Sequence, residues 1–368
     1  MARRLVALDL PGGPAFVDAL RAVWDRGDTA LPVDQRIPQP ARAELIDAMR
    51  PSSVIDAGGD ESPLAGGLPT DERDALVVVT SGTTGLPKGV VLTHEAVTAS
   101  AIASSARLEV ATDDHWLACL PLSHVGGLSV VTRALHTGTR LTVVAGFDVD
   151  AVERSGATLV SLVSPALHRI DASRFRKILL GGARPPSGLP PNVVTTYGMT
   201  ETGSGVVYDG VPLDGVELRI VSGEVHVRCP MLLRCYRDGT SPLVDGWFAT
   251  GDGGRLEADG QLVVDGRIGE LIITGGENVW PQAVEAVLSR HPAVHDVAIA
   301  GRPDAEWGEV VVAYVVAADD PPSLDDLRDH VKASLPAYNA PRELVLVDEV
   351  PRTTLGKIVR TKSNPPIS

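Results

Sequence analysis

The pattern of apolar and polar positions divides the chain into regions of different character. Between residues 74 and 200, short apolar runs alternate with stretches of helical periodicity, and the runs lie at residues 76–79, 115–120, 141–144, 158–163, 176–180 and 193–196. A run of this length, bounded by turn residues, is typical of a buried strand. Strands separated by helices predict a mostly parallel α/β sheet, and ligands of such sheets bind at the carboxyl ends of the strands.

The region after this sheet has a different pattern. Residues 211–265 hold short apolar segments with turns between them, for example at Gly223, which predicts hairpins and a small β subdomain. Residues 266–368 mix predicted strands with helical stretches, which indicates a small α+β domain. We therefore predict a large N-terminal domain over residues 1–265 and a small C-terminal domain over residues 266–368.

Periodicity is clear in only some of the remaining segments. Residues 15–24 have the spacing of a helix, and residues 324–335 have that of an amphipathic helix. In the first 70 residues we expect one short strand over 53–56, followed by a Gly/Pro-rich linker over 57–69.

Composition narrows the classes of partner. The 368 residues carry 33 basic and 47 acidic side chains, a net charge of −14, which disfavours nucleic acid or an anionic membrane as the partner. Cys119, Cys229 and Cys235 lack the spacing of a metal site or a disulfide framework, and neither a signal peptide nor a membrane-spanning stretch is recognisable. We predict reduced thiols and a cytoplasmic location. The oligomeric state stays open, with a homodimer among the options.

The stretch TSGTTGLPKG, Thr80 to Gly89, is the strongest chemical signal. It follows the strand at 76–79 and precedes a helix that Thr93 is expected to cap. Its glycines let the backbone approach a bulky anion, while its hydroxyls and Lys88 supply donors and a positive charge, as a nucleotide triphosphate requires. It is not a Walker A loop, because Pro87 and Gly89 flank the lysine.

Further motifs follow along the chain. PLSHVGG (121–127), GGAR (181–184) and TTYGMTET (195–202) come after predicted strands. Glu201 is a hard oxygen ligand suited to Mg²⁺, which usually binds one or two carboxylates plus phosphates. Taken alone, His124 fits a structural loop histidine better than a ligand, and its position after the strand makes the two alternatives about equal. Arg184 could be a solvated charge or a partner for an extra substrate carboxylate.

Together with TGD (250–252), DGR (265–267) and PRTTLGK (351–357), these motifs resemble the adenylate-forming superfamily of acyl-CoA synthetases, peptide-synthetase adenylation domains and luciferases. The resemblance implies an α/β fold with a large N-terminal domain of mostly parallel sheets, a small β subdomain, and a small, mobile α+β C-terminal domain. Family members usually carry a much longer region before the phosphate loop, so the front of this chain is expected to be truncated.

The resemblance also implies roles for individual residues. The residues implied to bind the nucleotide are Thr80, Ser81, Gly82, Thr83, Thr84, Gly85, Lys88, Gly181, Gly182, Ala183, Tyr197, Gly198, Met199, Asp252 and Arg267. The implied catalytic residues are Lys357, Glu201, Thr200 and His124, with Glu201 holding Mg²⁺. The acyl substrate is assigned to His124, Gly126 and Arg184, the hinge to Asp265, and the coenzyme A channel to Gly275 and Gly276. The usual acidic residue two places after Arg267 is replaced by Gly269, with Glu270 next.

The implied reaction joins a carboxylic acid to ATP, which gives an acyl-adenylate and pyrophosphate, and then transfers the acyl group to coenzyme A. PLSHVGGL and GELIITGGENVWPQAVEAVL resemble the o-succinylbenzoate–CoA ligases of menaquinone synthesis, in particular the short actinobacterial forms. Two alternatives stay open: a ligase for another aryl or short acyl acid, and a nucleotide-binding module without turnover.

Overall fold

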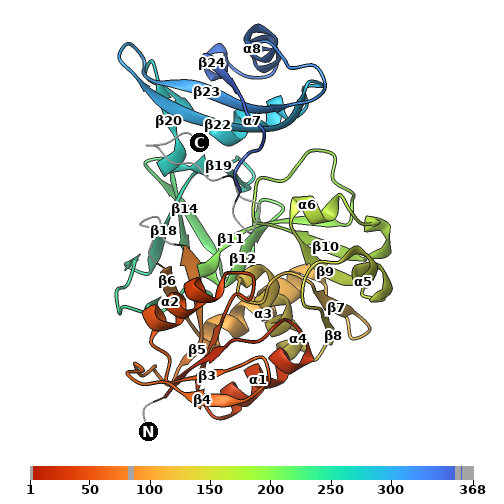
Figure 1. Cartoon of the computed structure of the whole chain (residues 1–368), viewed down its shortest axis with the longest axis vertical. Helices are drawn as coiled ribbons and strands as arrows, with labels where there is room; N and C mark the ends of the chain where they lie inside the picture. The colour runs from red at the N-terminus through yellow and green to blue at the C-terminus, as the bar shows by residue number, and fades with distance from the viewer. Residues whose placement is uncertain (1–2, 82–86, 353–357, 359–368) are drawn as a thin grey trace. The chain divides into compact units, whose positions relative to one another are not determined.

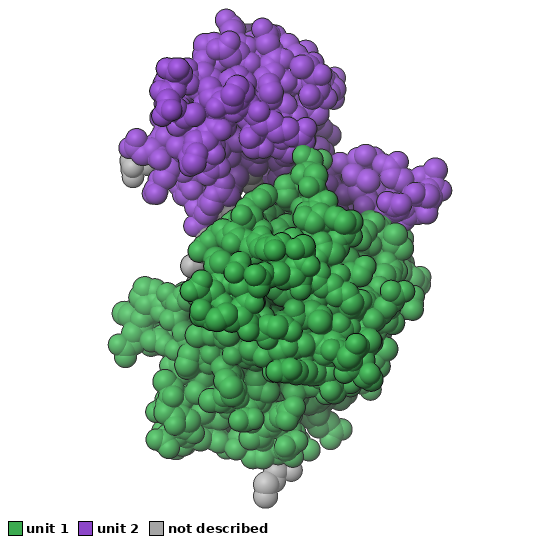
Figure 2. Space-filling view, turned by 90° about the vertical axis from the view of Figure 1, so that its right-hand side faces the viewer, with its two compact units in different colours: residues 1–218, 227–248 green, residues 219–226, 249–368 purple. Residues whose placement is uncertain are grey.

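The structure is a computed structural model that describes residues 3–81, 87–352 and 358 (Figure 1). The chain divides into unit 1, residues 1–218 and 227–248, and unit 2, residues 219–226 and 249–368 (Figure 2). The predicted domain boundary at residue 265 stays a prediction. Within the described ranges, no helix is long and apolar enough to cross a bilayer.

The first sheet of unit 1 has seven strands in the order β16-β6-β5-β2-β1-β3-β4. The strands are β1 (Leu5–Leu8), β2 (Thr29–Pro32), β3 (Ser53–Ile55), β4 (Glu61–Pro63), β5 (Asp74–Ser81), β6 (Pro87–Thr93) and β16 (Cys235–Tyr236). The predicted linker over 57–69 is wrong in part, because it contains β4, which pairs antiparallel with β3. All three residues of β4 are exposed, so this edge strand shows no apolar signal.

The predicted phosphate loop connects two antiparallel strands. Thr80 of β5 lies opposite Lys88 of β6. We did not predict β6 from the sequence, although Val90 to Leu92 are buried in it. The helix expected after it is confirmed: in α3 (His94–Leu108) the Thr93 hydroxyl accepts a hydrogen bond from the backbone N–H of Ala96.

The second sheet of unit 1 has the order β13-β12-β11-β10-β9-β7-β8, and its first five strands along the chain are parallel. The strands are β7 (His115–Ala118), β8 (Arg140–Val143), β9 (Leu159–Leu162), β10 (Lys177–Leu180), β11 (Val193–Met199), β12 (Ser204–Tyr208) and β13 (Val211–Pro212). This confirms the predicted mostly parallel α/β sheet, to which β12 and β13 add antiparallel pairs.

The helices of unit 1 connect these strands. Besides α3 they are α1 (Pro14–Asp25), α2 (Gln39–Met49), α4 (Val125–Thr137), α5 (Val149–Arg154) and α6 (Ser164–Leu167), with 3-10 turns η1 (Ala172–Arg174) and η2 (Thr200–Thr202). One apolar core joins the first sheet to α2, and it includes Leu31, Met49, Val77, Val91 and Cys235. The three cysteines are free thiols.

A five-stranded sheet follows in sequence, and its strands contain residues of both units. Its order is β14-β15-β18-β17, with β19 also paired to β18. The strands are β14 (Glu217–Val221), β15 (Glu224–Arg228), β17 (Leu243–Val244), β18 (Trp247–Leu256) and β19 (Leu262–Arg267). The sequence predicts a short strand over residues 248–250 with Asp252 at its end, but β18 is longer, so Asp252 lies inside the strand and not at its end.

Unit 2 has its own sheet in the order β21-β20-β23-β22, with β24 on β23. Its elements are β20 (Ile272–Thr274), β21 (Glu277–Val279), α7 (Pro281–Leu288), β22 (Val294–Asp304), β23 (Gly308–Ala317), α8 (Leu324–Lys332), β24 (Glu343–Leu346), η3 (Ile268–Glu270) and η4 (Ala337–Asn339). Both helices pack on one core with the sheet through Val284, Leu288, Leu327 and Val331. Helix α8 ends three residues before its predicted end at residue 335.

Candidate active site

Lys88, Tyr236 and Glu201 lie together in unit 1. The Lys88 ammonium is 5.4 Å from the centre of the Tyr236 ring, and the Tyr236 hydroxyl donates to Glu201 Oε1 at 3.1 Å. Burial and the negative charge of Glu201 raise the pKa of Tyr236, so the phenol keeps its proton and acts as the donor. Lys88 and Glu201 were both predicted to bind one nucleotide, but Tyr236, which contacts both, was not predicted.

Several predicted residues of the phosphate loop, and the predicted catalytic lysine, lie outside the described residues. They are Gly82, Thr83, Thr84, Gly85 and Lys357. Thr80 is half-buried near the end of β5, where Ser81 is the last residue, and Lys88 is exposed near the start of β6. Thr80 and Lys88 therefore present one hydroxyl and one ammonium group at the end of the hairpin where the loop connects its two strands.

The turn Gly181-Gly182 directly follows β10, and the motif TTYGMTET begins on the neighbouring strand β11. Leu180 at the end of β10 pairs with Thr195 of β11, and a Cβ on Gly181 would lie 2.7 Å from the Thr196 hydroxyl oxygen. Gly182 has a φ of +89°, which favours glycine. The backbone thus packs closely around the turn that the resemblance assigns to adenine, and Ala183 is exposed beside it.

Tyr197, Gly198 and Met199 belong to β11, although the sequence had predicted that the strand ends before them. An irregularity in the pairing with β12 lies between Tyr197 and Gly198, and the half-buried Tyr197 precedes the turn η2, which carries Thr200 and Glu201. The bulge explains why the apolar alternation stops before the strand does. Glu201 also receives a backbone bond at its carbonyl from Leu233 N at 2.8 Å.

His124 contacts the N-terminal part of unit 1. It precedes α4, and its Nε2 lies 2.9 Å from Arg36 Nη2 and 3.2 Å from Asp34 Oδ2. Burial by itself would raise the pKa of Asp34, but hydrogen bonds from Arg36 and His124 outweigh it and hold this pKa far below its usual value. The histidine is therefore held by a charged pair that the sequence did not associate with it. Gly126 is exposed in the first turn of the same helix.

Arg133 is a buried cation that sequence reasoning also missed. It is 2% exposed, and its partners are the hydroxyls of Ser104 (2.8 Å), Ser204 (2.8 Å) and Tyr208 (3.3 Å), with the Trp116 ring 5.5 Å from Cζ. Its Nη1 is buried and has no hydrogen-bond partner among the described residues. A single arginine in the apolar run of α4 was the available signal. Arg184, the residue predicted instead, is exposed.

In unit 2, Asp252 and Arg267 form an ion pair across β18 and β19. Arg267 Nε lies 2.9 Å from Asp252 Oδ1, and Arg267 Nη1 donates to the Thr250 carbonyl at 2.9 Å. The prediction placed both residues at the nucleotide, and the structure brings them together. The predicted hinge residue Asp265 accepts a hydrogen bond from Arg255 at 2.9 Å.

Gly275 and Gly276 form the tight turn between β20 and β21. Their φ angles are +59° and +83°, in the left-handed region that favours glycine. A Cβ on Gly275 would lie 2.8 Å from the Trp307 ring. The glycines are therefore required by the turn itself, whatever part they have in binding coenzyme A.

The residues of unit 1 suit a metal–nucleotide complex better than a metal alone. Among the described residues, no group of three or more His, Cys, Asp or Glu side chains could hold a metal ion. Mg²⁺ needs only one or two protein carboxylates when phosphate oxygens complete its shell. One carboxylate, Glu201, beside the exposed ammonium of Lys88 fits that donor set.

Comparison with known proteins agrees with this chemistry. The model of the AMP-binding enzyme family matches residues 60–280, and that of the AMP-binding enzyme C-terminal domain matches residues 283–357. A probable 2-succinylbenzoate–CoA ligase of Mycobacterium tuberculosis is 41% identical over 390 aligned residues, covering 96% of each chain. A 2-succinylbenzoate–CoA ligase of Bacillus cereus is 36% identical, covering 78% of this chain and 69% of its own.

Solved structures give the same result. The o-succinylbenzoate–CoA synthetase of Bacillus subtilis, in complex with its acyl-adenylate intermediate, superposes with a TM-score of 0.87 at 29% identity, over 98% of this chain and 88% of that one. The same enzyme with ATP and a magnesium ion gives a TM-score of 0.85 at 28% identity, over 98% and 89%. On its sequence, its fold and the arrangement of Lys88 and Glu201, this chain belongs to the AMP-binding enzyme family.

Proposed function

We propose that this protein is an AMP-forming acid–CoA ligase that converts o-succinylbenzoate to o-succinylbenzoyl-CoA in menaquinone biosynthesis. The proposal rests on the Lys88–Tyr236–Glu201 arrangement, in a chain that covers nearly the whole length of a relative named 2-succinylbenzoate–CoA ligase. A related structure holds the acyl-adenylate of the same acid, and another holds ATP and magnesium.

The reaction has two balanced steps. A carboxylate oxygen of the acid attacks the α-phosphorus of ATP, and the bond to the β-phosphate oxygen breaks, so that pyrophosphate leaves. The sulfur of coenzyme A then attacks the acyl carbon, AMP leaves with the electron pair of the broken C–O bond, and the thiol proton goes to solvent or a base. In the first step two anions approach each other, so the site must neutralise charge at the phosphates.

Each group in this charge-neutralising set has a proposed part. Lys88 and the hydroxyls of the loop hold the β- and γ-phosphates, and Glu201 holds Mg²⁺ together with phosphate oxygens. The bound ion supplies electrostatic stabilisation of charge on the transferring phosphates. Lys357 is proposed to neutralise the α-phosphate, and Thr200 to donate to a phosphate oxygen.

The remaining predicted residues are proposed to orient the other parts of the substrates. Tyr197 and the Gly181-Gly182 turn pack against adenine, and Asp252 accepts hydrogen bonds from the ribose hydroxyls while Arg267 fixes its carboxylate. The 2.9 Å contact between these two side chains supports that division of labour. Asp265 as the hinge, Gly275 and Gly276 at the coenzyme A channel, a cytoplasmic location and a homodimer remain predictions.

The second carboxylate of o-succinylbenzoate needs a cationic partner, and we assign it to Arg133 in preference to Arg184. Arg133 is buried and, within the ranges that the structure describes, its Nη1 has no hydrogen-bond partner, whereas Arg184 is exposed. A small cavity is lined by Thr132 and Gly203, the sequence neighbours of Arg133 and of its partner Ser204. A buried donor without a partner costs free energy that a bound carboxylate would recover.

The test is AMP release from Mg-ATP and coenzyme A with o-succinylbenzoate, compared with benzoate. We expect turnover with the first acid and little with the second, because benzoate lacks the group assigned to Arg133. Equal turnover with both acids would mean a ligase of broader specificity. If no acid in a panel supports AMP release or pyrophosphate exchange, the chain is not a ligase.

A further inference from the structure

The segment from Leu233 to Arg237 runs across the base of the predicted phosphate loop. Its backbone N–H groups donate to Glu201 O from Leu233 (2.8 Å), to Val91 O from Arg234 (2.9 Å) and to Gly89 O from Arg237 (2.7 Å). Its two strand residues, Cys235 and Tyr236, pair with Val91 and Val90 of β6. The segment is thus hydrogen-bonded to Glu201, whose carboxylate is the proposed magnesium ligand, and to β6, the strand that carries Lys88.

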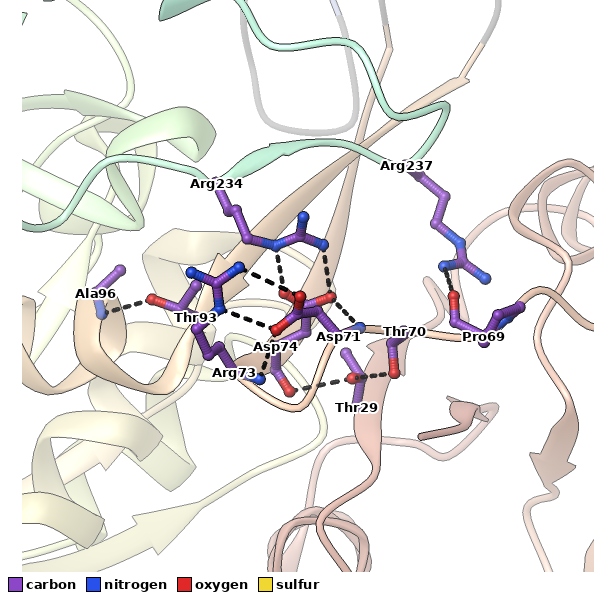
Figure 3. Close-up of polar contacts among 10 residues, drawn as sticks. All are labelled: Thr29, Pro69, Thr70, Asp71, Arg73, Asp74, Thr93, Ala96, Arg234 and Arg237. Carbon is purple, nitrogen blue, oxygen red and sulfur yellow. Dashed lines mark hydrogen bonds and ion pairs between the residues drawn. The ribbon is translucent and has the colours of Figure 1, made fainter. Parts of the chain in front are cut away.

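Two arginines fix this segment to the rest of unit 1 (Figure 3). Arg234 donates from Nε and Nη2 to the two carboxylate oxygens of Asp74, both at 2.8 Å, and the Asp74 side chain is 1% exposed. The Arg237 guanidinium donates to four backbone carbonyls, those of Met49, Arg50, Leu68 and Pro69. The position of the segment therefore does not depend on the side chain of Tyr236.

The side chain of Tyr236 lies on the face of β16 opposite to that of Cys235. Because side chains alternate along a strand, Cys235 enters the apolar core while Tyr236 projects from the opposite face. There its hydroxyl donates to Glu201 Oε1 at 3.1 Å and its ring faces the Lys88 ammonium at 5.4 Å. A single half-buried side chain thus contacts both groups assigned to the metal–triphosphate complex.

We propose that Tyr236 is a positioning residue that orients the Glu201 carboxylate and the Lys88 ammonium for Mg-ATP. The inference rests on the proposed function, because it takes Glu201 as the magnesium ligand. An anchored oxygen restricts rotation of the carboxylate, so less conformational freedom is lost when the metal binds. Outer-shell hydrogen bonds of this kind usually change metal affinity by about 10- to 100-fold when removed.

The test is Tyr236→Phe, which keeps the ring beside Lys88 and removes only the hydroxyl. Binding of ATP is measured by calorimetry at a series of Mg²⁺ concentrations, without any acid. We expect the half-saturating Mg²⁺ concentration to rise about tenfold. In pyrophosphate exchange the same shift is expected, while the KM for the acid stays at the wild-type value.

Tyr314→Phe is the matched control, because it removes a phenol hydroxyl from the core of unit 2. It is expected to leave the Mg²⁺ titration unchanged. A second variant, Tyr236→Leu, removes the ring as well, and we expect it to raise the KM for ATP beyond the value in Tyr236→Phe, since Lys88 then lacks the ring that it faces.

A double-mutant cycle separates positioning from a merely structural role. If Tyr236 acts through Glu201, then Tyr236→Phe should have little further effect on the Mg²⁺ titration in a Glu201→Gln background. The proposal is overturned if Tyr236→Phe binds Mg-ATP like the wild type, or if it lowers the melting temperature and weakens every ligand equally. Because the calorimetry contains no acid, a wild-type protein that is inactive with o-succinylbenzoate would contradict the proposed function and leave this inference standing.

Discussion

Arg234 and Arg133 of unit 1 both bind buried partners, and they do so in opposite ways. Arg234 meets the full carboxylate of Asp74, with both contacts at 2.8 Å. Arg133 meets three hydroxyls, and in the part of the chain that the structure describes no carboxylate lies within ion-pair distance of it. The Arg234 guanidinium has its counterion within the fold, whereas the Arg133 guanidinium has none among the residues that the structure describes.

This difference in partners distinguishes Arg234, which stabilises the fold, from Arg133, which the proposed function assigns to the substrate. Burying an unpaired charge costs several kcal/mol, and hydroxyls together with an aromatic ring compensate only part of that cost. The proposed function explains the cost at Arg133 by an anionic ligand, whereas Arg234 holds a permanent partner in Asp74. The predictions below test this contrast, and they run from the largest expected effect to the smallest.

Breaking the paired site should reduce stability most. Asp74→Ala leaves Arg234 without its counterion, and removing one member of a buried pair costs about 3–5 kcal/mol. Because Arg234 is itself half-exposed, we expect the lower end of that range, measured by urea unfolding. The matched control is Asp71→Ala, which removes an exposed partner of Arg73 and should cost less than about 1 kcal/mol. Equal losses in the two variants would contradict the role of the Arg234–Asp74 pair.

Removing the unpaired cation should reduce activity and leave stability largely intact. In Arg133→Met the substrate's second carboxylate has no partner, which costs about 2–3 kcal/mol, so kcat/KM for o-succinylbenzoate should fall on the order of 10²-fold. Unfolding by urea should be as hard as in the wild type or harder, because an unpaired buried charge is gone. Arg184→Met, which changes an exposed arginine, should have little effect on either quantity.

A contrary result is easy to recognise. If Arg133→Met loses several kcal/mol of stability and keeps its preference for o-succinylbenzoate over benzoate, then Arg133 is a structural arginine like Arg234. The two arginines would then not differ in kind.

The sequence predicted local features better than distant contacts. The parallel strands were predictable because their signal, an apolar run bounded by turn residues, is local, and the motif from Thr80 to Gly89 that predicts the phosphate loop is local in the same way. Arg133 lies 71 residues from Ser204, and Tyr236 lies 35 residues from Glu201, so no window of sequence shows these contacts. The pairing of His124 with Asp34 spans 90 residues and was missed for the same reason.

The errors in the fold also have local causes. Strand β4 is exposed on an edge and has no apolar alternation, so it was interpreted as linker. Strand β18 continues past residue 250 through Gly251, Asp252 and Gly253, which are typical of turns. Here the pairing with β19 holds the segment extended and overrides its local preference.

A smaller effect is expected at a second ion pair, Asp114–Arg176, whose contribution to the free energy of unfolding should depend on pH. Burial alone would raise the pKa of Asp114, but bonds from Arg176, Ala111 and Thr158 outweigh it and lower this pKa. A carboxylate whose pKa is lowered in the folded state stabilises the fold at pH values above its unfolded-state pKa of about 4. This stabilisation is lost as the pH falls through the folded-state pKa. Asp114→Asn should therefore be clearly less stable than the wild type at pH 6, with the gap narrowing toward pH 3.

Urea unfolding at the two pH values measures this gap. The stability difference between Arg133→Met and the wild type should stay constant over the same range, because no carboxylate of the described residues forms an ion pair with Arg133. A gap for Asp114→Asn that is constant with pH would show that the Asp114–Arg176 pair contributes no titratable stability.

The smallest expected effect is that of Tyr208→Phe. The Tyr208 hydroxyl contacts Arg133 Nη2 at 3.3 Å and is the longest of its three hydroxyl bonds, so its loss should cost about 0.5–1 kcal/mol. If Arg133 binds the substrate, that cost appears as a roughly two- to fivefold change in the KM for o-succinylbenzoate, with kcat unchanged. If Arg133 is only structural, the same cost appears in urea unfolding and the KM stays constant. Measuring both quantities on this one variant therefore decides which kind of arginine it is, even where the larger change at Arg133 itself disturbs the fold.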